Sequence, residues 1–184
     1  MKLNAKQLRS YSRLAISHLP KANSQKLTAK NNIYIVLDNV LDTYNIGSIF
    51  RLADAIGAKK VYLCRETETP PNHRIKKASI NTTEWVEWEY AETAVSAIKN
   101  LKLKIKNLQT VAIEQSVRSI PYDQFEYKLP ICLVVGHESH GVSKEVLEMV
   151  DGIVEIPMFG VNISLNVMVS LGIVLYEVIE ISSK

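Results

Sequence analysis

The amino-acid sequence predicts an α/β protein whose sheet is mostly parallel and is covered by helices on both faces. Segments of strand length alternate with segments of helical periodicity along the chain, which is typical of this class. The central strand segments, 33–38 and 131–135, are continuous apolar runs, as expected for strands buried on both faces. The chain has 184 residues, of which 47% are hydrophobic and 22% charged, so it can bury a substantial core.

The first half of the chain is predicted to form two strands around one helix. The apolar run "NNIYIVLDNV" (31–40) has the length of a strand, and "KKVYLC" (59–64) is a second, shorter one. Between them, "YNIGSIFRLADAIG" (44–57) is predicted as a helix that stops at Gly57 and buries one face: Ile49, Ala53 and Ile56. The polar segment 65–83 is predicted to be a long loop, and loops of this length are usually functional or mobile.

The second half continues the alternation of strands and helices. The segment "EWVEWEY" (84–90) has the pattern of a strand of mixed burial, and 91–106 is predicted as a helix with lysines in its last turns, where cations suit the helix dipole. The remaining predicted elements are two strands, a short helix, a short strand and a final helix, at 109–114, 131–135, 143–149, 152–156 and from about 165 onward.

The positive charge of the chain is concentrated near its N-terminus. The net charge is +3, but residues 1–37 hold seven Lys or Arg and no Asp or Glu, while the remainder holds 15 basic and 19 acidic residues. Four of the basic residues fall on one helical stripe: Lys2, Lys6, Arg9 and Arg13. Such a stripe is either a solvated helix face or a surface that meets a polyanion such as nucleic acid. We therefore divide the chain into a basic N-terminal helical arm, 1–30, and an α/β domain, 31–184.

Several function classes lack their sequence signatures. The chain has no GxGxxG or GxxxxGK[ST] phosphate loop, no GxSxG nucleophile motif and no Cys/His cluster with metal spacing, so we expect no metal. Cys64 and Cys132 are predicted to be buried thiols in a reducing compartment. No secretory signal opens the chain, and polar residues break its longest apolar stretch, 165–181. These features predict a soluble, cytoplasmic protein without a membrane partner.

Three polar clusters follow predicted strands at their carboxyl ends. The first contains Asn45 and Arg51, the second is "GHESHGVS" (136–143), and the third is "IPMFGVNISLN" (156–166). In parallel sheets this edge is where binding sites are built. The third cluster places three polar side chains, Asn162, Ser164 and Asn166, before the final helix, and helix capping explains only one of them.

The three clusters and their flanking residues resemble a known family. The segments "NIGSIFRLADAIGAKKVYL", "VVGHESHGVS" and "IPMFGVNISLNVMVSLGIVLYE" are similar to the three ordered motifs of the SpoU/TrmH-type RNA ribose 2′-O-methyltransferases, in the SPOUT class. The resemblance covers roughly residues 33–181. It implies a C-terminal trefoil knot, a homodimer, and S-adenosyl-L-methionine (AdoMet) as methyl donor. Knots are rare, and only the resemblance supports one here.

The resemblance also implies catalytic roles for five residues. Arg51 would activate the ribose 2′-hydroxyl, either by accepting its proton or, as a fixed cation, by holding a phosphate and stabilising the alkoxide. A solvent-facing helix residue is the plain alternative for Arg51. Asn45 would orient Arg51 or the RNA, or else cap its helix. Glu138 would shape the site, and Ser164 and Asn166 would face the reacting centre.

The cofactor would lie against the second and third motifs. The resemblance assigns cofactor contacts to backbone groups around Gly136, Ile156 and Leu165, and apolar walls to residues that include Leu133 and Met158. Because Gly has no Cβ, it allows a ligand to approach the backbone closely. Ordinary core and turn residues are the alternative interpretation of these positions.

The RNA partner would be structured tRNA or rRNA, and the sequence does not say which. Contacts are expected from the basic arm and from the cations of segment 65–83, Arg74, Lys76 and Lys77, with His137 and His140 at the rim. The segment Ser79, Ile80 and Asn81 departs from the Thr and Gly residues common in relatives. Two alternatives stay open: a catalytically silent RNA-binding module of the same fold, and a methyltransferase that modifies a base. The final helix is apolar almost all round, which favours a partner subunit as part of its cover.

Overall fold

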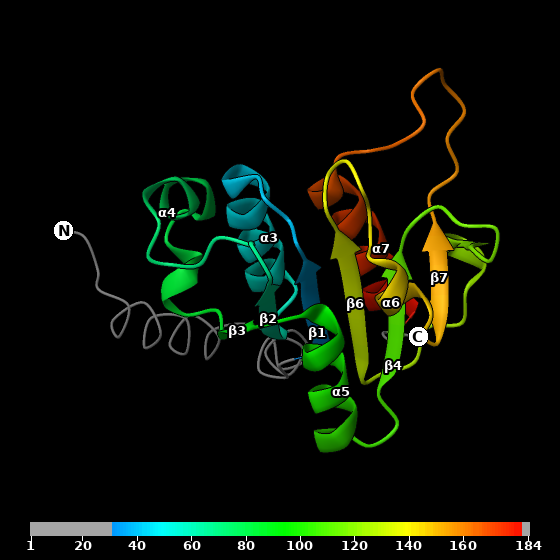
Figure 1. Cartoon of the computed structure of the whole chain (residues 1–184), viewed down its shortest axis with the longest axis horizontal. Helices are drawn as coiled ribbons and strands as arrows, with labels where there is room; N and C mark the ends of the chain where they lie inside the picture. Colours follow the sequence, from blue (N-terminus) through cyan, green and yellow to red (C-terminus); the bar gives the residue numbers. More distant parts are fainter. Residues whose placement is uncertain (1–30, 182–184) are drawn as a thin grey trace, which may run out of the picture.

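The computed structural model describes residues 31–181, which form one parallel sheet with helices on both faces (Figure 1). The sheet has seven strands in this part of the chain, in the order β3-β2-β1-β6-β4-β7-β5, and every pairing is parallel. Their bounds are β1 Asn31–Asp38, β2 Ala58–Cys64, β3 Trp88–Ala91, β4 Gln109–Ile113, β5 Ile120–Pro121, β6 Ile131–Gly136 and β7 Gly152–Glu155. The predicted fold class is confirmed.

Helices cover the two faces of this sheet separately. Their bounds are α3 Thr43–Ala55, α4 His73–Ser79, α5 Ala94–Lys104, α6 Lys144–Leu147 and α7 Val167–Ile181, with short 3₁₀ turns η1 Thr82–Glu84 and η2 Tyr122–Gln124. One core cluster joins α3 and α7 to one side of the strands, and a second joins α5 and α6 to the other side. In β1, for example, Ile35 and Leu37 enter the first cluster and Val36 the second. This two-sided burial explains the continuous apolar runs.

The three central strands end side by side. Asp38, the last residue of β1, pairs with Gly136 at the end of β6 and with Cys64 at the end of β2. The segments that follow these strands therefore start from one edge of the sheet. This is the carboxyl edge at which the sequence predicts a site.

Helix α3 begins and ends with the expected signals. The side chain of Asp42 accepts a hydrogen bond from the Tyr44 N–H and so caps the helix, a role that the sequence had left open for Asn45. At the other end, Gly57 has a φ of 63°, a conformation that glycine adopts without strain. At Gly47, a Cβ would lie 2.5 Å from the Cβ of Ala78, so this position allows α4 to pack closely against α3.

Two predictions of local structure are corrected. Segment 65–83 is not a plain loop, because Asn72 caps α4 by accepting N–H groups from Arg74 and Ile75, and Ile75 is fully buried. The strand predicted at 84–90 begins only at Trp88 and ends at Ala91. Trp85 is directed instead toward α3, where its indole N–H donates to Asp54 at 2.7 Å. The short β5 and η2 were not predicted.

The remaining expectations concern the cysteines, the arm and membrane spans. Cys64 and Cys132 are buried free thiols, and burial raises the pKa of Cys64 to about 12. The predicted arm, 1–30, lies outside the described residues. Within residues 31–181, no helix combines the length and apolarity that a membrane crossing requires.

Candidate active site

A pocket of about 420 Å³ opens at the carboxyl edge of β4, β6 and β7. Its volume suits a small-molecule ligand. Five segments line it: 113–115 at the end of β4, 135–141 at the end of β6, 155–156 and Met158 at the end of β7, 163–167 at the start of α7, and Ser170 within α7. The second and third predicted polar clusters therefore share one cavity.

Three of the predicted catalytic residues form one hydrogen-bonded chain at this edge. The amide of Asn45, which is buried in the first turn of α3, donates to the Glu138 carboxylate at 3.0 Å. Its carbonyl oxygen accepts a hydrogen bond from the amide of Asn166 at 2.9 Å. These two hydrogen bonds thus connect three segments that lie far apart in the sequence, and each segment comes from a different predicted cluster.

Glu138 is held as a carboxylate by this arrangement. Burial alone would raise its pKa, but hydrogen bonds from the Asn45 side chain and from the backbone N–H groups of Asp42 and Leu41 outweigh that effect, so its pKa lies below the usual value. Glu138 therefore accepts hydrogen bonds at neutral pH and fixes the entry to α3 against the turn after β6.

Asn166 has two functions at once. Its side-chain oxygen accepts N–H groups of Met168 at 2.9 Å and Val169 at 3.4 Å, and its backbone carbonyl accepts from Ser170, which is the geometry of an N-cap for α7. Its amide nitrogen remains free to bond Asn45. Ser164 lines the pocket, whereas Asn162 is exposed and lies outside it.

The turn after β6 closes tightly on itself. The backbones of His137 and Gly141 exchange two hydrogen bonds, 3.0 and 2.8 Å long. A Cβ at Gly136 would lie 2.1–2.2 Å from the backbone of Gly141 and Val142. Glycine is therefore required at position 136 by the return of its own chain, and not only by a ligand.

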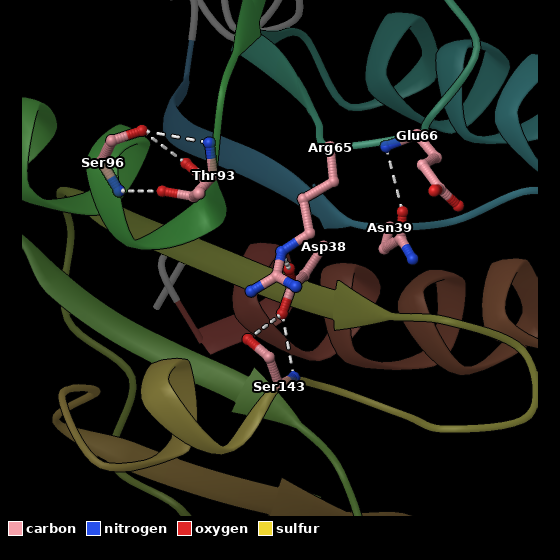
Figure 2. A network of polar contacts seen from close by, with 7 residues as sticks. All are labelled: Asp38, Asn39, Arg65, Glu66, Thr93, Ser96 and Ser143. Atoms are coloured by element: carbon pink, nitrogen blue, oxygen red, sulfur yellow. Dashed lines mark hydrogen bonds and ion pairs between the residues drawn. The ribbon is translucent and has the colours of Figure 1, made fainter.

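A buried carboxylate anchors the far end of this turn to β1. Asp38 is 2% exposed and accepts hydrogen bonds from the backbone N–H and the hydroxyl of Ser143, at 2.9 and 2.5 Å (Figure 2). The Arg65 side chain reaches over from the end of β2, and its Nε lies 3.7 Å from Asp38. The turn is thus fixed both to β1 and to α3.

Three predicted site residues do not line the pocket: Asn45, Arg51 and Leu133. Asn45 still reaches its edge through its bonds to Glu138 and Asn166, both of which line the cavity. Arg51 is exposed on α3, and its side chain makes no hydrogen bond or ion pair with any residue that the structure describes. Leu133 is fully buried in the core. Val135, which lies on the same face of β6 but two residues nearer its end, lines the pocket in place of Leu133. The other predicted cofactor residues, Gly136, Ile156, Met158 and Leu165, all line the cavity.

Sequence reasoning missed the acidic character of the pocket. Three carboxylates line it, Glu114, Glu138 and Glu155, and among the described lining residues there is no Lys or Arg. Glu114 and Gln115 directly follow β4, and their position at the carboxyl end of the strand predicted at 109–114 was the signal that could have indicated them. Such a lining favours a ligand that carries positive charge.

Known proteins resemble this chain in both sequence and structure. The SpoU rRNA Methylase family model matches residues 32–176. A tRNA (guanosine(18)-2′-O)-methyltransferase from Aquifex aeolicus is 35% identical over 154 residues, which cover 80% of this chain and 69% of that protein.

Two solved structures extend the comparison. The A. aeolicus TrmH/SpoU tRNA modifying enzyme matches with a TM-score of 0.75 and 29% identity, over 91% of this chain and 82% of that one. An AdoMet-bound rRNA methyltransferase from Sinorhizobium meliloti matches with a TM-score of 0.75 and 29% identity, over 83% and 57%. Together with the family match over most of the described residues, these likenesses establish that the chain belongs to the SpoU rRNA methylase family.

Proposed function

We propose that this protein transfers a methyl group from AdoMet to the 2′-hydroxyl of a ribose in tRNA or rRNA, in the cytoplasm. The observation that carries the proposal is the hydrogen-bonded chain Glu138–Asn45–Asn166 beside the acidic pocket. It joins the polar residues of all three family motifs at one point. The relatives described above, a tRNA (guanosine(18)-2′-O)-methyltransferase and an rRNA methyltransferase, agree with it.

The residues of the pocket fit AdoMet. AdoMet carries two positive groups, a sulfonium and an ammonium, and one negative carboxylate, so its net charge is positive. Three glutamates, with no Lys or Arg among the described residues of the lining, complement that charge, and Ile156 and Met158 supply apolar surface. AdoMet, when bound, supplies an activated methyl group, and no metal is needed for its transfer.

The protein's own task is to position the ribose and accept its proton. Asn45 and Asn166 are held rigidly by their mutual bond, which suits the orientation of a hydroxyl near the methyl group. Arg51 would receive the hydroxyl proton or, more easily for a guanidinium, stabilise the alkoxide and hold the neighbouring phosphate. Ser164, at the pocket wall, would bond the ribose or the cofactor.

The position of Arg51 supports a homodimer. The neighbouring Leu52 lies against Gly172 of α7, where an added Cβ would stand 3.6 Å from both methyl groups of Leu52. The turn of α3 that carries Arg51 therefore adjoins a helix that a single chain leaves partly uncovered. Exposed apolar side chains on or before this helix include Leu165, Val169 and Tyr176. A second copy covering this face would bring Arg51 into a closed environment. Sedimentation at micromolar concentration would test this, and a stable monomer would contradict it.

The C-terminal knot and the RNA contacts are further parts of the proposal. We infer that α7 is threaded through a loop, as the family implies, and that the exposed cations Arg74 and Lys77 meet the RNA backbone together with the arm. Replacing both cations by Ala should weaken RNA binding without changing AdoMet affinity.

The deciding experiment is methyl transfer from labelled AdoMet to total RNA from cells that lack the protein. Nuclease digestion and mass spectrometry would then locate the methyl group on ribose or base. A 2′-O-methylated nucleotide is expected, and its loss in Arg51→Ala, but not in Lys99→Ala on α5, would place the chemistry at Arg51. AdoMet binding without any transfer would favour a silent RNA-binding module.

A further inference from the structure

Two residues just after β4, Glu114 and Gln115, connect the two walls of the pocket. Ala112 in β4 pairs with Val134 in β6, so the chain leaves β4 level with the end of β6. From there the two side chains run to different segments. One reaches the turn 137–141 and its exit, and the other reaches the loop 156–166.

Glu114 holds the turn 137–141 through hydrogen bonds at its exit. Its carboxylate accepts the backbone N–H of Val142 at 2.8 Å and that of Gln115 at 2.9 Å. The carboxylate also lies against Gly141, where an added Cβ would stand 2.0 Å from Oε2. Glu114 therefore fixes the position of the turn that forms one wall of the pocket. Its carboxylate also lines the cavity and has no cation partner among the described residues.

Gln115 supports the opposite wall. Its side-chain amide donates to the carbonyl oxygen of Ile163 at 2.5 Å. Within the described chain, this is the one hydrogen bond that residues 157–165 make. The flanking side chains of this loop are open to solvent, with Phe159 97% and Val161 100% exposed. The loop therefore depends on Gln115 for its distance from the sheet.

We propose that Glu114 and Gln115 are positioning residues that hold the two walls at the spacing AdoMet needs, and that the Glu114 charge makes the pocket prefer AdoMet over its product. The inference rests on the proposed methyltransferase function. Transfer converts the sulfonium of AdoMet into the neutral thioether of S-adenosylhomocysteine. A carboxylate near the cofactor therefore attracts the substrate form more than the product form, which favours product release.

Titration calorimetry with AdoMet and with S-adenosylhomocysteine on the full chain separates the two effects. Glu114→Gln removes the charge, and it should weaken AdoMet binding about fivefold more than product binding. Glu114→Asp keeps the charge but shortens the reach, so it should weaken both ligands by similar factors. Gln115→Ala should also weaken both alike. Glu126→Gln is the matched control, because the Glu126 side chain is exposed, pairs with Lys128 and does not line the pocket.

The outcomes are distinct. Unchanged affinities in Glu114→Asp and Gln115→Ala, in chains that melt like the unaltered protein, would overturn the positioning role. Equal weakening of both ligands by Glu114→Gln would overturn the charge preference. If the unaltered chain bound neither ligand, the methyltransferase function itself would fail, whereas normal binding with insensitive variants would remove only the inference about Glu114 and Gln115.

Discussion

The turn 137–141 and the loop 156–166 form opposite walls of one pocket, but they are built in opposite ways. The turn is closed by its own backbone bonds and is tied at its ends to β1, β4 and α3 through Asp38, Glu114 and Asn45. The loop projects beyond the sheet (Figure 1) and is tied to the body by Gln115 in its middle and by Asn166 at its end.

This difference in construction suggests different roles for the two walls in ligand binding. A wall that is prebuilt loses little conformational entropy when a ligand binds, whereas a loosely held wall loses more. The turn is therefore suited to define where the cofactor lies, and the loop is suited to close over it. Variants that affect the turn should act mainly on stability, and variants in the loop should act mainly on binding and catalysis.

The largest effect is expected from the same substitution made in both walls. Gly136→Ala places a Cβ about 2 Å from the returning backbone, so the turn must open, at a cost of about 3 kcal/mol in the free energy of unfolding. In Gly160→Ala, in the loop, the added Cβ meets nothing within 4 Å and the backbone is not in the left-handed region, so the change should alter stability by less than about 0.5 kcal/mol. Urea denaturation measures both. Similar losses in the two variants would contradict the comparison.

Removal of the buried anchor should have the next largest effect. Asp38→Ala leaves the N–H and hydroxyl of Ser143 without their acceptor, which should cost about 2 kcal/mol. Asp123→Ala, at an exposed position in η2, is the control and should be nearly neutral. Thermal unfolding followed by circular dichroism compares them. If Asp38→Ala melted with the control, the turn would not depend on this anchor.

A smaller change in stability, with a large change in rate, is expected at Asn166. Asn166→Ala removes the cap of α7 and should cost about 1 kcal/mol. Asn166→Asp keeps an oxygen for the cap but loses the N–H that bonds Asn45, so its stability should be nearly unchanged. Both variants should lower the kcat of methyl transfer by about 100-fold if the bond orients the site.

The pair of Asn166 variants separates the two functions of this side chain. A fully active Asn166→Asp chain would show that the Asn45 bond does not matter for the reaction. A stable but inactive one would assign the cap and the orientation to different atoms of one residue.

Much of the fold was predictable because its signals are local. Apolar continuity in β1 and β6 reports burial on both faces, and the spacing in α3 reports its buried stripe. Helix α4 was missed because it is short and polar, with Ile75 as its main buried side chain. β5 has two residues, which is too short for any periodicity to appear.

The site was predictable in its parts but not in its connections. The carboxyl-edge rule and the family motifs selected Asn45, Glu138 and Asn166, and the structure joins them. Which side chain touches which loop depends on how the chain closes in three dimensions. Gln115 contacts Ile163 across 48 positions in the sequence, and no local pattern encodes that distance. For the same reason, the position of Arg51 on the exposed side of α3 does not reveal which residues would contact it in an oligomer.

The smallest expected effect concerns the tie between the turn and α3, and it appears as a dependence on pH. The pKa of Glu138 is lower in the folded chain than in an unfolded one, because three hydrogen bonds favour its carboxylate more than burial disfavours it. The tie is therefore at full strength above the ordinary glutamate pKa of about 4.3 and is lost as the pH falls through the lowered folded value. Glu138→Gln should be less stable than the unaltered protein near neutral pH, and the difference should shrink in acid. Urea denaturation from about pH 7 to about pH 3 measures this difference.

Asp151, whose pKa is also lowered, lies away from the pocket and supplies the control variant Asp151→Asn. The pH-dependent stability that Asp151 contributes should persist in the Glu138→Gln variant. If the loss of stability in Glu138→Gln stayed constant with pH, the carboxylate of Glu138 would not be what holds the turn to α3.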